Sequence, residues 1–399
     1  MSSIVGVDVV NLHYEYPDGG IRCAEGLANA RLTSLVKVSL SNGLVGVGSA
    51  YSHPDLVRII VEEHLAPLLV GEDPTEVERL WNFMYTLTRW YGRKGAAVSA
   101  LGAVDIALWD LRGKLADRPI FELLGGRRRT VDTYASALLW QDDVAQVAAE
   151  ARQHRADGFT NMKMRAGRDD AYDRSAVAAI FAAIAPGGRL AVDGTHNYTA
   201  TRAQAFGALL AEHDALWFEE PFPPEDIDAY VELRKRTDVP LAAGENEFGL
   251  QGFRELFRAG AIDIAQPDAS RAGGITECRR IAQLAEASGI SVATHSWNDA
   301  VAVLANAHLV AASPNGLMVE IDRTGNPFLE ALSRQPLAIS GGRLTLPDGP
   351  GLGIELDDAF IEAHVVPPGR RVADGNYADM VFGKAFLSST APERARSSQ

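Results

Sequence analysis

Cysteine is scarce in this sequence. Cys23 and Cys278 are the only two among 399 residues, and no C-x-x-C spacing occurs. This scarcity excludes a disulfide-stapled scaffold and a zinc site built from clustered cysteines. Two thiols in so long a chain are typical of a reducing compartment, so we expect a cytoplasmic protein.

Long apolar runs are also missing. No segment approaches the roughly 18 consecutive apolar residues that a membrane-spanning helix needs. The first residues lack a charged stretch followed by an apolar one, so the sequence predicts no signal peptide. We therefore expect no membrane partner.

Positive charge is in the minority. The chain has 38 Lys and Arg against 52 Asp and Glu, which gives a net charge of −14. Nucleic acids and anionic membranes bind basic patches, so this balance argues against both partners. An anionic substrate would need local positive charge or a metal ion at its site. Hydrophobic residues make up 47% of the chain, enough for a large core.

Seven charged or titratable residues recur at the interval of one strand plus one helix. They follow short apolar runs, and the gaps between them are 30, 26, 26, 23, 27 and 25 residues. One strand, loop and helix of a (β/α)₈ barrel take about 25 to 30 residues, and chemistry collects at the C-terminal ends of the strands. The cadence therefore predicts an enzyme whose site residues ring one barrel mouth. The seven are Lys163, Asp193, Glu219, Glu245, Asp268, His295 and Glu320.

The chain divides into three regions by pattern. Residues 1–129 show alternating strands with an Asn42-Gly43 hairpin signal, then three helical stretches, which together predict an α+β unit. Residues 130–325 alternate strands and helices in eight βα steps, which predicts a closed barrel. Residues 326–399 are rich in turns, and we expect them to pack back on the N-terminal unit with a frayed end.

Three of the carboxylates predict a metal site. Asp193, Glu219 and Glu245 end three consecutive strands. Three carboxylates converging on one point raise one another's pKa unless a cation lies between them. A hard divalent ion with oxygen ligands and open positions suits such a site, and Mg²⁺ is the natural choice.

The remaining residues predict charged groups on both sides of that metal, with a poised acid–base pair on one of them. Lys163 and Arg165 stand in a K-x-R pattern on one strand, so both side chains point into the mouth. Asp268 and His295 lie across the barrel, where a carboxylate beside imidazole would fix its tautomer and raise its basicity.

The ordered motifs resemble the enolase superfamily, in the mandelate racemase subgroup, over residues 1–385. They include KMR at 163–165, WFEEP at 217–221, GEN at 244–246, QPDASRAGG at 266–274 and THSW at 294–297. The resemblance implies an α/β fold with a modified TIM (β/α)₇β-type barrel under an α+β capping domain. It implies Mg²⁺ on Asp193, Glu219 and Glu245, and abstraction of the proton α to a carboxylate. Homo-oligomers are common in this family, so we expect one here.

The same resemblance implies roles for the substrate-binding residues. Lys163 matches the family's carboxylate-neutralising lysine, and Glu320 matches a glutamate that donates a hydrogen bond to the substrate carboxylate. That donation requires protonated Glu320, which we expect because burial near other carboxylates favours the neutral form. Arg165 replaces the family's second lysine. Guanidinium, with a pKa above about 12, is a better anchor or stabiliser than a base.

With one competent base, the sequence favours elimination over racemisation. His295 would remove the α-proton and protonate the departing hydroxyl of a sugar acid, an aldonate or aldarate. The resemblance leaves two alternatives, an aldarate-lactone cycloisomerase and a racemase or epimerase of an α-hydroxy acid. Two alternatives from other functional classes are a Schiff-base aldolase that uses Lys163 and a non-catalytic binding protein.

Specificity in this family comes from loops of the capping domain. An aldarate would need a second cationic anchor, and the sequence does not choose among Arg22, Arg93 and Arg271. Thr195 departs from the family's Asn, and His196 beside it is either a substrate contact or a solvent-facing residue. Further candidate contacts are Tyr14, Tyr16, Tyr51, His53, Trp90 and Trp140.

Overall fold

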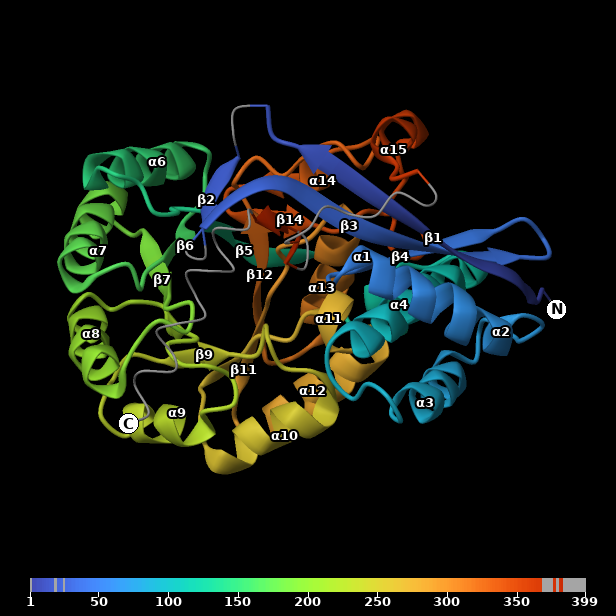
Figure 1. Cartoon of the computed structure of the whole chain (residues 1–399), viewed down its shortest axis with the longest axis horizontal. Helices are drawn as coiled ribbons and strands as arrows, with labels where there is room; N and C mark the ends of the chain where they lie inside the picture. The colour runs from blue at the N-terminus through green and yellow to red at the C-terminus, as the bar shows by residue number, and fades with distance from the viewer. Residues whose placement is uncertain (1, 18–19, 24–25, 368–375, 378–379, 383–399) are drawn as a thin grey trace.

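The computed structural model describes residues 2–17, 20–23, 26–367, 376–377 and 380–382. Its centre is a barrel of eight parallel strands, closed because β12 pairs with both β11 and β5 (Figure 1). The strands are β5 (Thr130–Ser136), β6 (Asn161–Arg165), β7 (Arg189–Asp193), β8 (Phe218–Glu219), β9 (Leu241–Ala243), β10 (Ile264–Ala265), β11 (Ser291–Thr294) and β12 (Gly316–Asp322). The predicted barrel is thus confirmed.

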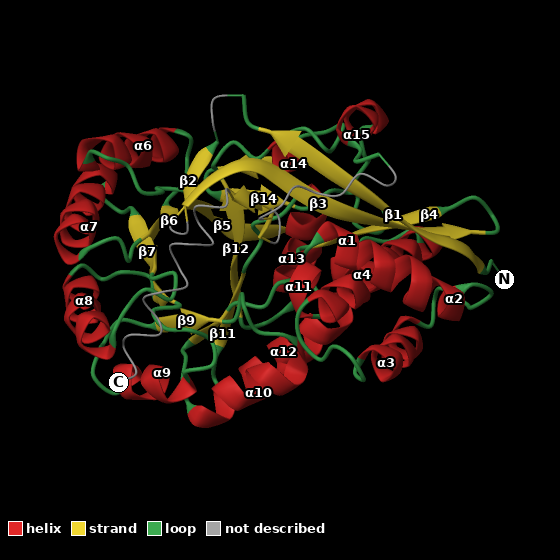
Figure 2. Ribbon diagram, viewed as in Figure 1, coloured by secondary structure: helices red, strands yellow, loops and turns green. Residues whose placement is uncertain are grey.

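Helices surround the barrel on the outside (Figures 1 and 2). They are α6 (Val144–Ala156), α7 (Asp170–Ile184), α8 (Ala200–Glu212), α9 (Ile227–Arg234), α10 (Gly249–Ala259), α11 (Ala269–Ala272), α12 (Gly274–Ala287) and α13 (Ala300–Ala312). After β12 comes only the four-residue α14 (Pro327–Glu330), so the barrel is of the (β/α)₇β type.

Side-chain caps explain where several of these helices begin. The residue before each first turn accepts a hydrogen bond from a backbone N–H that has no partner within the helix. These caps are Asp143, Asp169, Thr199, Asp226, Asp268 and Asp299.

An apolar layer fills the barrel interior below its mouth. It contains Tyr134, Ala191, Leu216, Trp217, Ala242, Ile264 and Ala293. The Tyr134 and Trp217 rings meet edge to face at 5.2 Å. Side chains alternate along a strand, so a residue two positions after a layer residue also faces inward, but one layer higher. The alternation places Asp193, Glu219 and His295 above this layer.

The N-terminal unit is an antiparallel sheet covered by helices (Figure 2). Strand β3 (Gly26–Leu40) pairs with β1 (Ile4–Glu15), β2 (Ile21–Cys23), β4 (Val45–Ala50) and β16 (Met380–Phe382). The expected Asn42-Gly43 turn joins β3 to β4, with Gly43 at φ +87°. The helices are α1 (Pro54–Ile59), η1 (Ile60–Leu65), α2 (Ala66–Leu69), α3 (Val77–Thr88), α4 (Ala96–Ala116) and α5 (Ile120–Leu123).

The C-terminal region contacts both units. Strands β13 (Ala338–Ser340) and β14 (Arg343–Thr345) extend the barrel sheet beside β5. Beyond α15 (Asp358–His364), Val365 bridges Leu12 of the capping sheet, and β15 (Asn376–Tyr377) pairs with β16. The boundaries at 129/130 and 325/326 stay a prediction, and the expected frayed end lies outside the described residues.

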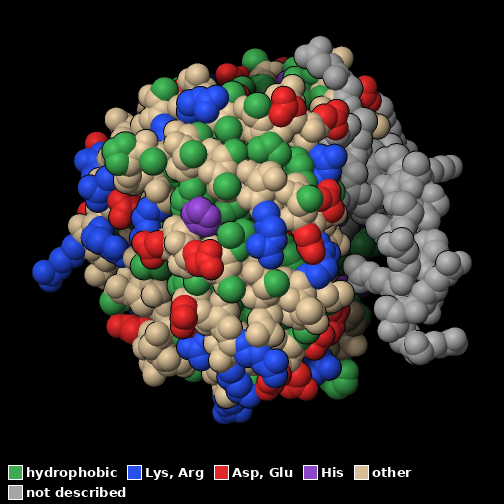
Figure 3. All heavy atoms as spheres, turned by 90° about the vertical axis from the view of Figure 1, so that its left-hand side faces the viewer, with side chains coloured by type: hydrophobic (Ala, Val, Ile, Leu, Met, Phe, Trp, Pro, Cys, Tyr) green, Lys and Arg blue, Asp and Glu red, His purple; other side chains and the backbone are tan. Residues whose placement is uncertain are grey.

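Acidic and basic side chains are interspersed on the face that carries α6, α7 and α8 (Figure 3). Among the described helices, none combines the length and apolarity needed to cross a membrane.

Candidate active site

The structure brings the seven predicted residues together at the C-terminal end of the barrel. Lys163 Nζ lies 2.5 Å from Glu219 Oε1, 2.8 Å from Glu320 Oε1 and 3.7 Å from Asp193 Oδ2. On the other side, His295 Nε2 lies 3.8 Å from both Glu245 Oε2 and Glu320 Oε2.

Strand positions explain this convergence. Asp193 and Glu219 are the last residues of β7 and β8 and pair in register. Glu245 lies two residues beyond the end of β9, and His295 directly follows β11. Lys163 and Arg165 are two residues apart on β6, so their side chains lie on the same face, as predicted.

The three carboxylates fit a divalent metal. One oxygen of each of Asp193, Glu219 and Glu245 lies within 4.8 Å of the others. Glu245 Oε2 is buried and has no hydrogen-bond partner among the described residues, which suits an oxygen awaiting a ligand. An all-oxygen donor set of this charge matches the preference of Mg²⁺.

Burial and neighbouring charges shift the pKa values of this cluster. Burial raises the pKa of the Glu219 carboxyl, the nearby Lys163 lowers it, and Glu245 raises it further, with a net rise. Burial lowers the pKa of Lys163, but attraction to Glu219 and Glu320 outweighs it, so the pKa rises overall. Lys163 therefore stays a cation.

The expectation that Glu320 is protonated is wrong in this structure. Burial raises the pKa of Glu320, but attraction to Lys163 and His295 lowers it well below its usual range. Its carboxylate already accepts a hydrogen bond from the Ser296 N–H at 2.9 Å. The sequence reasoning counted burial and missed the two cations on either side of this carboxylate.

Asp268 and His295 form the predicted dyad. His295 Nδ1 lies 2.7 Å from Asp268 Oδ2, so Nδ1 carries the proton and Nε2 faces the metal ligands. Asp268 Oδ1 accepts hydrogen bonds from Ser270 and Asn306, which hold the carboxylate in place. Burial lowers the pKa of His295, but Glu245, Glu320 and Asp268 raise it to about 9.

Arg165 makes an ion pair with Asp193, and its guanidinium carbon lies 4.6 Å from the centre of the Trp297 ring. Trp297 comes from the loop after β11 and packs against Ala28 of the capping sheet and Leu139. The loop after β11 thus reaches across the mouth to the strand that carries Arg165.

Sequence reasoning missed the residues that orient the ligands. Trp217 Nε1 and Gln266 Nε2 both donate to Glu219 Oε2, at 2.8 and 2.7 Å. Asn306 Nδ2 donates to Asp268 Oδ1 at 3.0 Å. Strand alternation was the available signal, because Trp217 and Gln266 stand two residues before Glu219 and Asp268.

His196 pairs with a carboxylate beside the metal ligands. Its Nε2 lies 2.5 Å from Glu220 Oε2, and Asn246 Nδ2 donates to the same oxygen at 2.8 Å. Burial raises the pKa of Glu220, but the hydrogen bond from His196 lowers it to about 2. Thr195 and His196 both have positive φ, at 47° and 61°.

The capping-domain candidates separate into two groups. Tyr51 is buried, and its ring lies 5.6 Å from that of His295. Tyr14 instead packs on Tyr16, 5.5 Å between ring centres, and Trp90 is 81% exposed. His53 caps α1 by accepting from the Asp55 N–H. The Arg22 side chain lies outside what the structure describes, and Trp140 Nε1 is buried without a hydrogen bond among the described residues.

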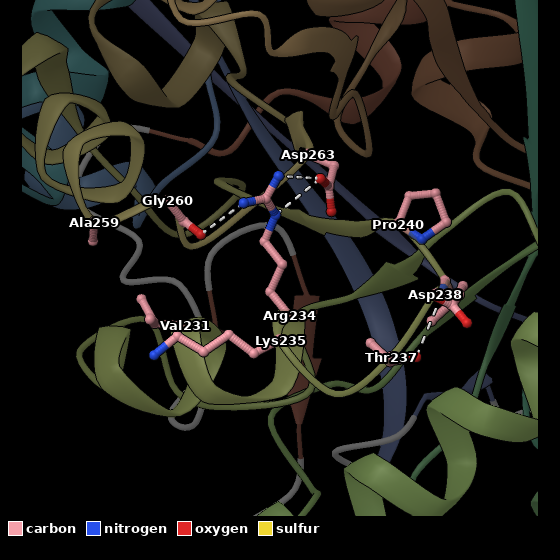
Figure 4. A pocket seen from close by; sticks show the side chains of 10 residues that line it. Val231, Arg234, Lys235, Thr237, Asp238, Pro240, Ala259, Gly260 and Asp263 are labelled. Atoms are coloured by element: carbon pink, nitrogen blue, oxygen red, sulfur yellow. Dashed lines mark hydrogen bonds and ion pairs between the residues drawn. The ribbon is translucent and has the colours of Figure 1, made fainter.

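Figure 4 shows a separate surface cavity of about 550 Å³. Its lining residues precede β9 and β10, so it lies at the end of the barrel where these strands begin. It is lined by the segment before β9 and by Asp263 before β10. Its Arg234 is already paired with Asp263, at 2.7 and 2.9 Å (Figure 4). The seven predicted site residues do not line it.

Comparison with known proteins gives the family. Residues 16–125 match the mandelate racemase/muconate lactonizing enzyme N-terminal domain, and residues 146–360 match the enolase C-terminal domain-like family. D-galactarolactone cycloisomerase of Agrobacterium fabrum is 38% identical over 84% of this chain and 92% of that protein. Arabinonate dehydratase of Saccharolobus solfataricus is 32% identical over 82% and 89%.

A similar solved structure is that of L-talarate dehydratase from Polaromonas sp. JS666, complexed with Mg and L-glucarate. It has a TM-score of 0.80 and 28% identity, covering 92% of this chain and 98% of that one. Both family matches, the near full-length relatives and the capped barrel agree with the resemblance seen in the motifs. This chain is an enzyme of the enolase superfamily, in the mandelate racemase subgroup.

Proposed function

We propose that this protein is a Mg²⁺-dependent dehydratase of a sugar acid. The observation that carries the proposal is the asymmetry of the site. One face of the carboxylate cluster carries the His295–Asp268 dyad, and the other carries Lys163 and Arg165, whose cations are paired with carboxylates. Relatives named as dehydratases, such as the arabinonate dehydratase, support the reaction class.

Asp193, Glu219 and Glu245 would hold the Mg²⁺. When bound, the metal would hold the substrate carboxylate and stabilise the negative charge that forms when the α-proton leaves. Magnesium in a similar solved structure supports this assignment. Lys163 would neutralise the substrate carboxylate from the other side, and Glu320 would shape the same subsite through its ion pair with Lys163.

His295 would carry both proton transfers. Its Nε2 takes the α-proton, while Asp268 stabilises the imidazolium that results. The same Nε2 then gives its proton to the β-hydroxyl, the carbon–oxygen bond breaks, and water leaves. The enol that remains tautomerises to a 2-keto-3-deoxy acid. Arg165 would anchor the substrate instead of acting as a second base.

A lactone cycloisomerase is the second candidate. The relative that is 38% identical is named as D-galactarolactone cycloisomerase. In that reaction the leaving oxygen belongs to the lactone ring, and His295 could still remove the α-proton. A racemase or epimerase is less well supported, because Arg165 is a poor base for the second face.

A substrate screen separates these candidates. Purified protein with Mg²⁺ is incubated with aldonates, aldarates and their lactones, and keto acid and NMR signals in D₂O are followed. We expect a 2-keto-3-deoxy product from one acid. Lactone consumption without a keto-acid product from any free acid would favour the cycloisomerase, and activity unchanged by EDTA would contradict both.

We also propose a cytoplasmic homo-oligomer, on the basis of the cysteine scarcity and the family. Light scattering coupled to size-exclusion chromatography tests the oligomer, and a mass of one chain would rule it out.

A further inference from the structure

Arg271 is a cation in the active-site region that is held in place without a counter-ion among the residues that the structure describes. It lies on α11, three residues after Asp268. Its guanidinium carbon lies 4.8 Å from the centre of the Tyr51 ring and 5.3 Å from that of Phe248. One nitrogen, Nη2, donates to Asn246 Oδ1 at 3.0 Å. Two aromatic rings and an amide therefore orient the group.

One of the other donors of Arg271, Nε, is buried and also has no acceptor in the described part of the chain. Within the same described part of the chain, no carboxylate oxygen forms an ion pair with its nitrogens; the one polar contact is the neutral Asn246 amide. A buried donor without an acceptor costs free energy, so a fixed guanidinium in this state is suited to an anionic ligand.

The location of Arg271 links it to the proposed chemistry. The Tyr51 ring that stacks on its guanidinium also lies 5.6 Å from the His295 ring. The Tyr51 N–H donates to Ser270 O at 3.0 Å, which fixes the capping loop beside α11. Arg271 is thus one aromatic ring away from the acid–base histidine.

Strand order places Arg271 opposite Lys163. Lys163 is on β6, and Arg271 follows β10, four strands further round the closed ring of eight. The two cations therefore come from opposite sides of the strand ring, and the strands that carry the carboxylate cluster and His295 lie between them in the strand order. This arrangement suits a short molecule with a negative charge at both ends.

We propose that Arg271 binds the distal carboxylate of a dicarboxylate substrate, so that the sugar acid is an aldarate or a lactone that keeps one free carboxylate. The inference rests on the proposed function and narrows its substrate class. A guanidinium presents two parallel N–H groups to a carboxylate. The terminal hydroxyl of an aldonate is neutral and would leave the charge of Arg271 unbalanced.

The test compares a diacid with the monoacid of the same configuration, which differ only at the distal carbon. The variants are R271Q and R271K, and R93Q is the control because Arg93 is an exposed arginine whose carbonyl accepts from Gln251 in the same region. We expect R271Q to lower kcat/KM for the diacid about 10- to 100-fold more than for the monoacid. R271K should recover part of the loss, and R93Q should leave the diacid-to-monoacid ratio unchanged.

Equal losses for both acids in R271Q would overturn the inference and assign Arg271 to packing between Tyr51 and Phe248. A wild-type preference for the monoacid would do the same. A binding experiment tests the role of Arg271 independently of the proposed function. With Mg²⁺ present, calorimetry compares adipate with adipate monoamide on the wild type and on R271Q. If neither sugar acid reacts, the dehydratase proposal fails, while tighter adipate binding that depends on Arg271 would still support the anion subsite.

Discussion

His295 is held by contacts that leave one ring nitrogen available for proton transfer. Asp268 accepts from Nδ1 at 2.7 Å, and Asn306 holds both Asp268 and the His295 carbonyl. Nε2 faces Glu245 and Glu320 at 3.8 Å. The side chain is therefore pre-oriented for one face of a bound carboxylic acid.

Replacement of His295 by Asn should abolish turnover while metal binding persists. We expect kcat to fall by about 10²- to 10⁴-fold, because the proposed base and acid are both lost. Calorimetry with Mg²⁺ should give an affinity close to that of the wild type, since His295 is not a ligand. The matched control is His64→Gln, on η1 of the capping domain. A variant that kept most of its activity would refute the one-histidine mechanism.

Mg²⁺ should lower the pKa of His295. Burial alone lowers this pKa, and attraction to Glu245 and Glu320 raises it to about 9. Because a bound cation offsets the charge of Glu245, the imidazolium loses part of its stabilisation, and the neutral base becomes available at lower pH. NMR titration of the imidazole nitrogens with and without Mg²⁺ measures both values. A His295 pKa that is the same with and without Mg²⁺ would contradict the assignment of Glu245 as a metal ligand.

Replacement of Arg165 by Lys should open the second face of the substrate to proton exchange. An amine loses its proton far more readily than a guanidinium does, and Arg165 lies on the side opposite His295. We expect deuterium incorporation at the α-carbon in D₂O by R165K, also when combined with H295N. An Arg165→Met variant controls for loss of the ion pair with Asp193. If R165K showed no deuterium exchange, the position of the side chain, and not its basicity, would be what prevents proton exchange on that face.

At the scale of elements, α4 and β4 approach each other so closely that only glycine fits between them. A Cβ at Gly48 would lie 1.9 Å from the Ala103 carbonyl oxygen, and one at Gly46 would lie 2.2 Å from that of Ala107. Both obstacles are backbone atoms of a buried helix, so neither can rotate away. The capping sheet therefore depends on these two glycines for its contact with α4.

Gly48→Ala should destabilise the protein by about 1 to 3 kcal/mol, because the added methyl group forces β4 away from α4. Gly6→Ala is the control, since its nearest contact would be Asp8 at an ordinary 3.5 Å, and we expect a change within about 0.5 kcal/mol. Urea unfolding followed by tryptophan fluorescence gives both values. Equal effects for the two variants would contradict the close-packing explanation.

At the scale of the whole molecule, buried polar residues connect the capping sheet to the barrel. Arg31 of β3 donates to Asp322 at 2.5 Å and to the Trp297 carbonyl at 3.2 Å. Asp299, which caps α13, accepts from Thr33 at 2.5 Å and Ser49 at 3.0 Å. These contacts lie next to the loops that carry the candidate site, so the capping sheet helps to fix its shape.

His308 joins three segments and should make stability fall in acid. Its Nδ1 accepts from the Phe121 N–H at 3.2 Å, and its Nε2 donates to Leu352 O at 3.2 Å. Burial lowers its pKa from 6.5 to about 4. Between these values the unfolded chain binds a proton that the folded one does not. The stabilisation is complete above pH 6.5 and is lost toward pH 4, at about 1.4 kcal/mol per pH unit.

The comparison that isolates this effect is wild type against His308→Gln across pH 4 to 7. The wild-type free energy of unfolding should drop relative to that of the variant as pH falls. Asp105 changes stability in the opposite direction, because burial raises its pKa from 3.8 to about 7. The total curve can therefore be nearly flat, and only the difference between the two proteins is diagnostic. A difference that does not vary with pH would contradict a neutral buried His308.

The sequence alone determined the barrel and the membership of its mouth. Strand ends recur at a fixed interval, and parallel strands bring those ends to one edge, so Asp193, Glu219 and Lys163 had to lie near one another. The same alternation oriented Arg165 into the mouth. The spacing of the strand ends and the alternation of side chains suffice for such inferences, because both follow from the geometry of the backbone.

Only the tertiary structure decided the charge states and the partners of these residues. The state of Glu320 depends on Lys163 and His295, which are distant in sequence, so burial by itself gave the wrong answer. The proposal that Arg271, and not Arg93, binds the distal carboxylate depends on Tyr51 and Phe248, which come from different units. Electrostatic interactions and ring stacking act across space, and their sum is fixed only when the capping domain has been placed on the barrel.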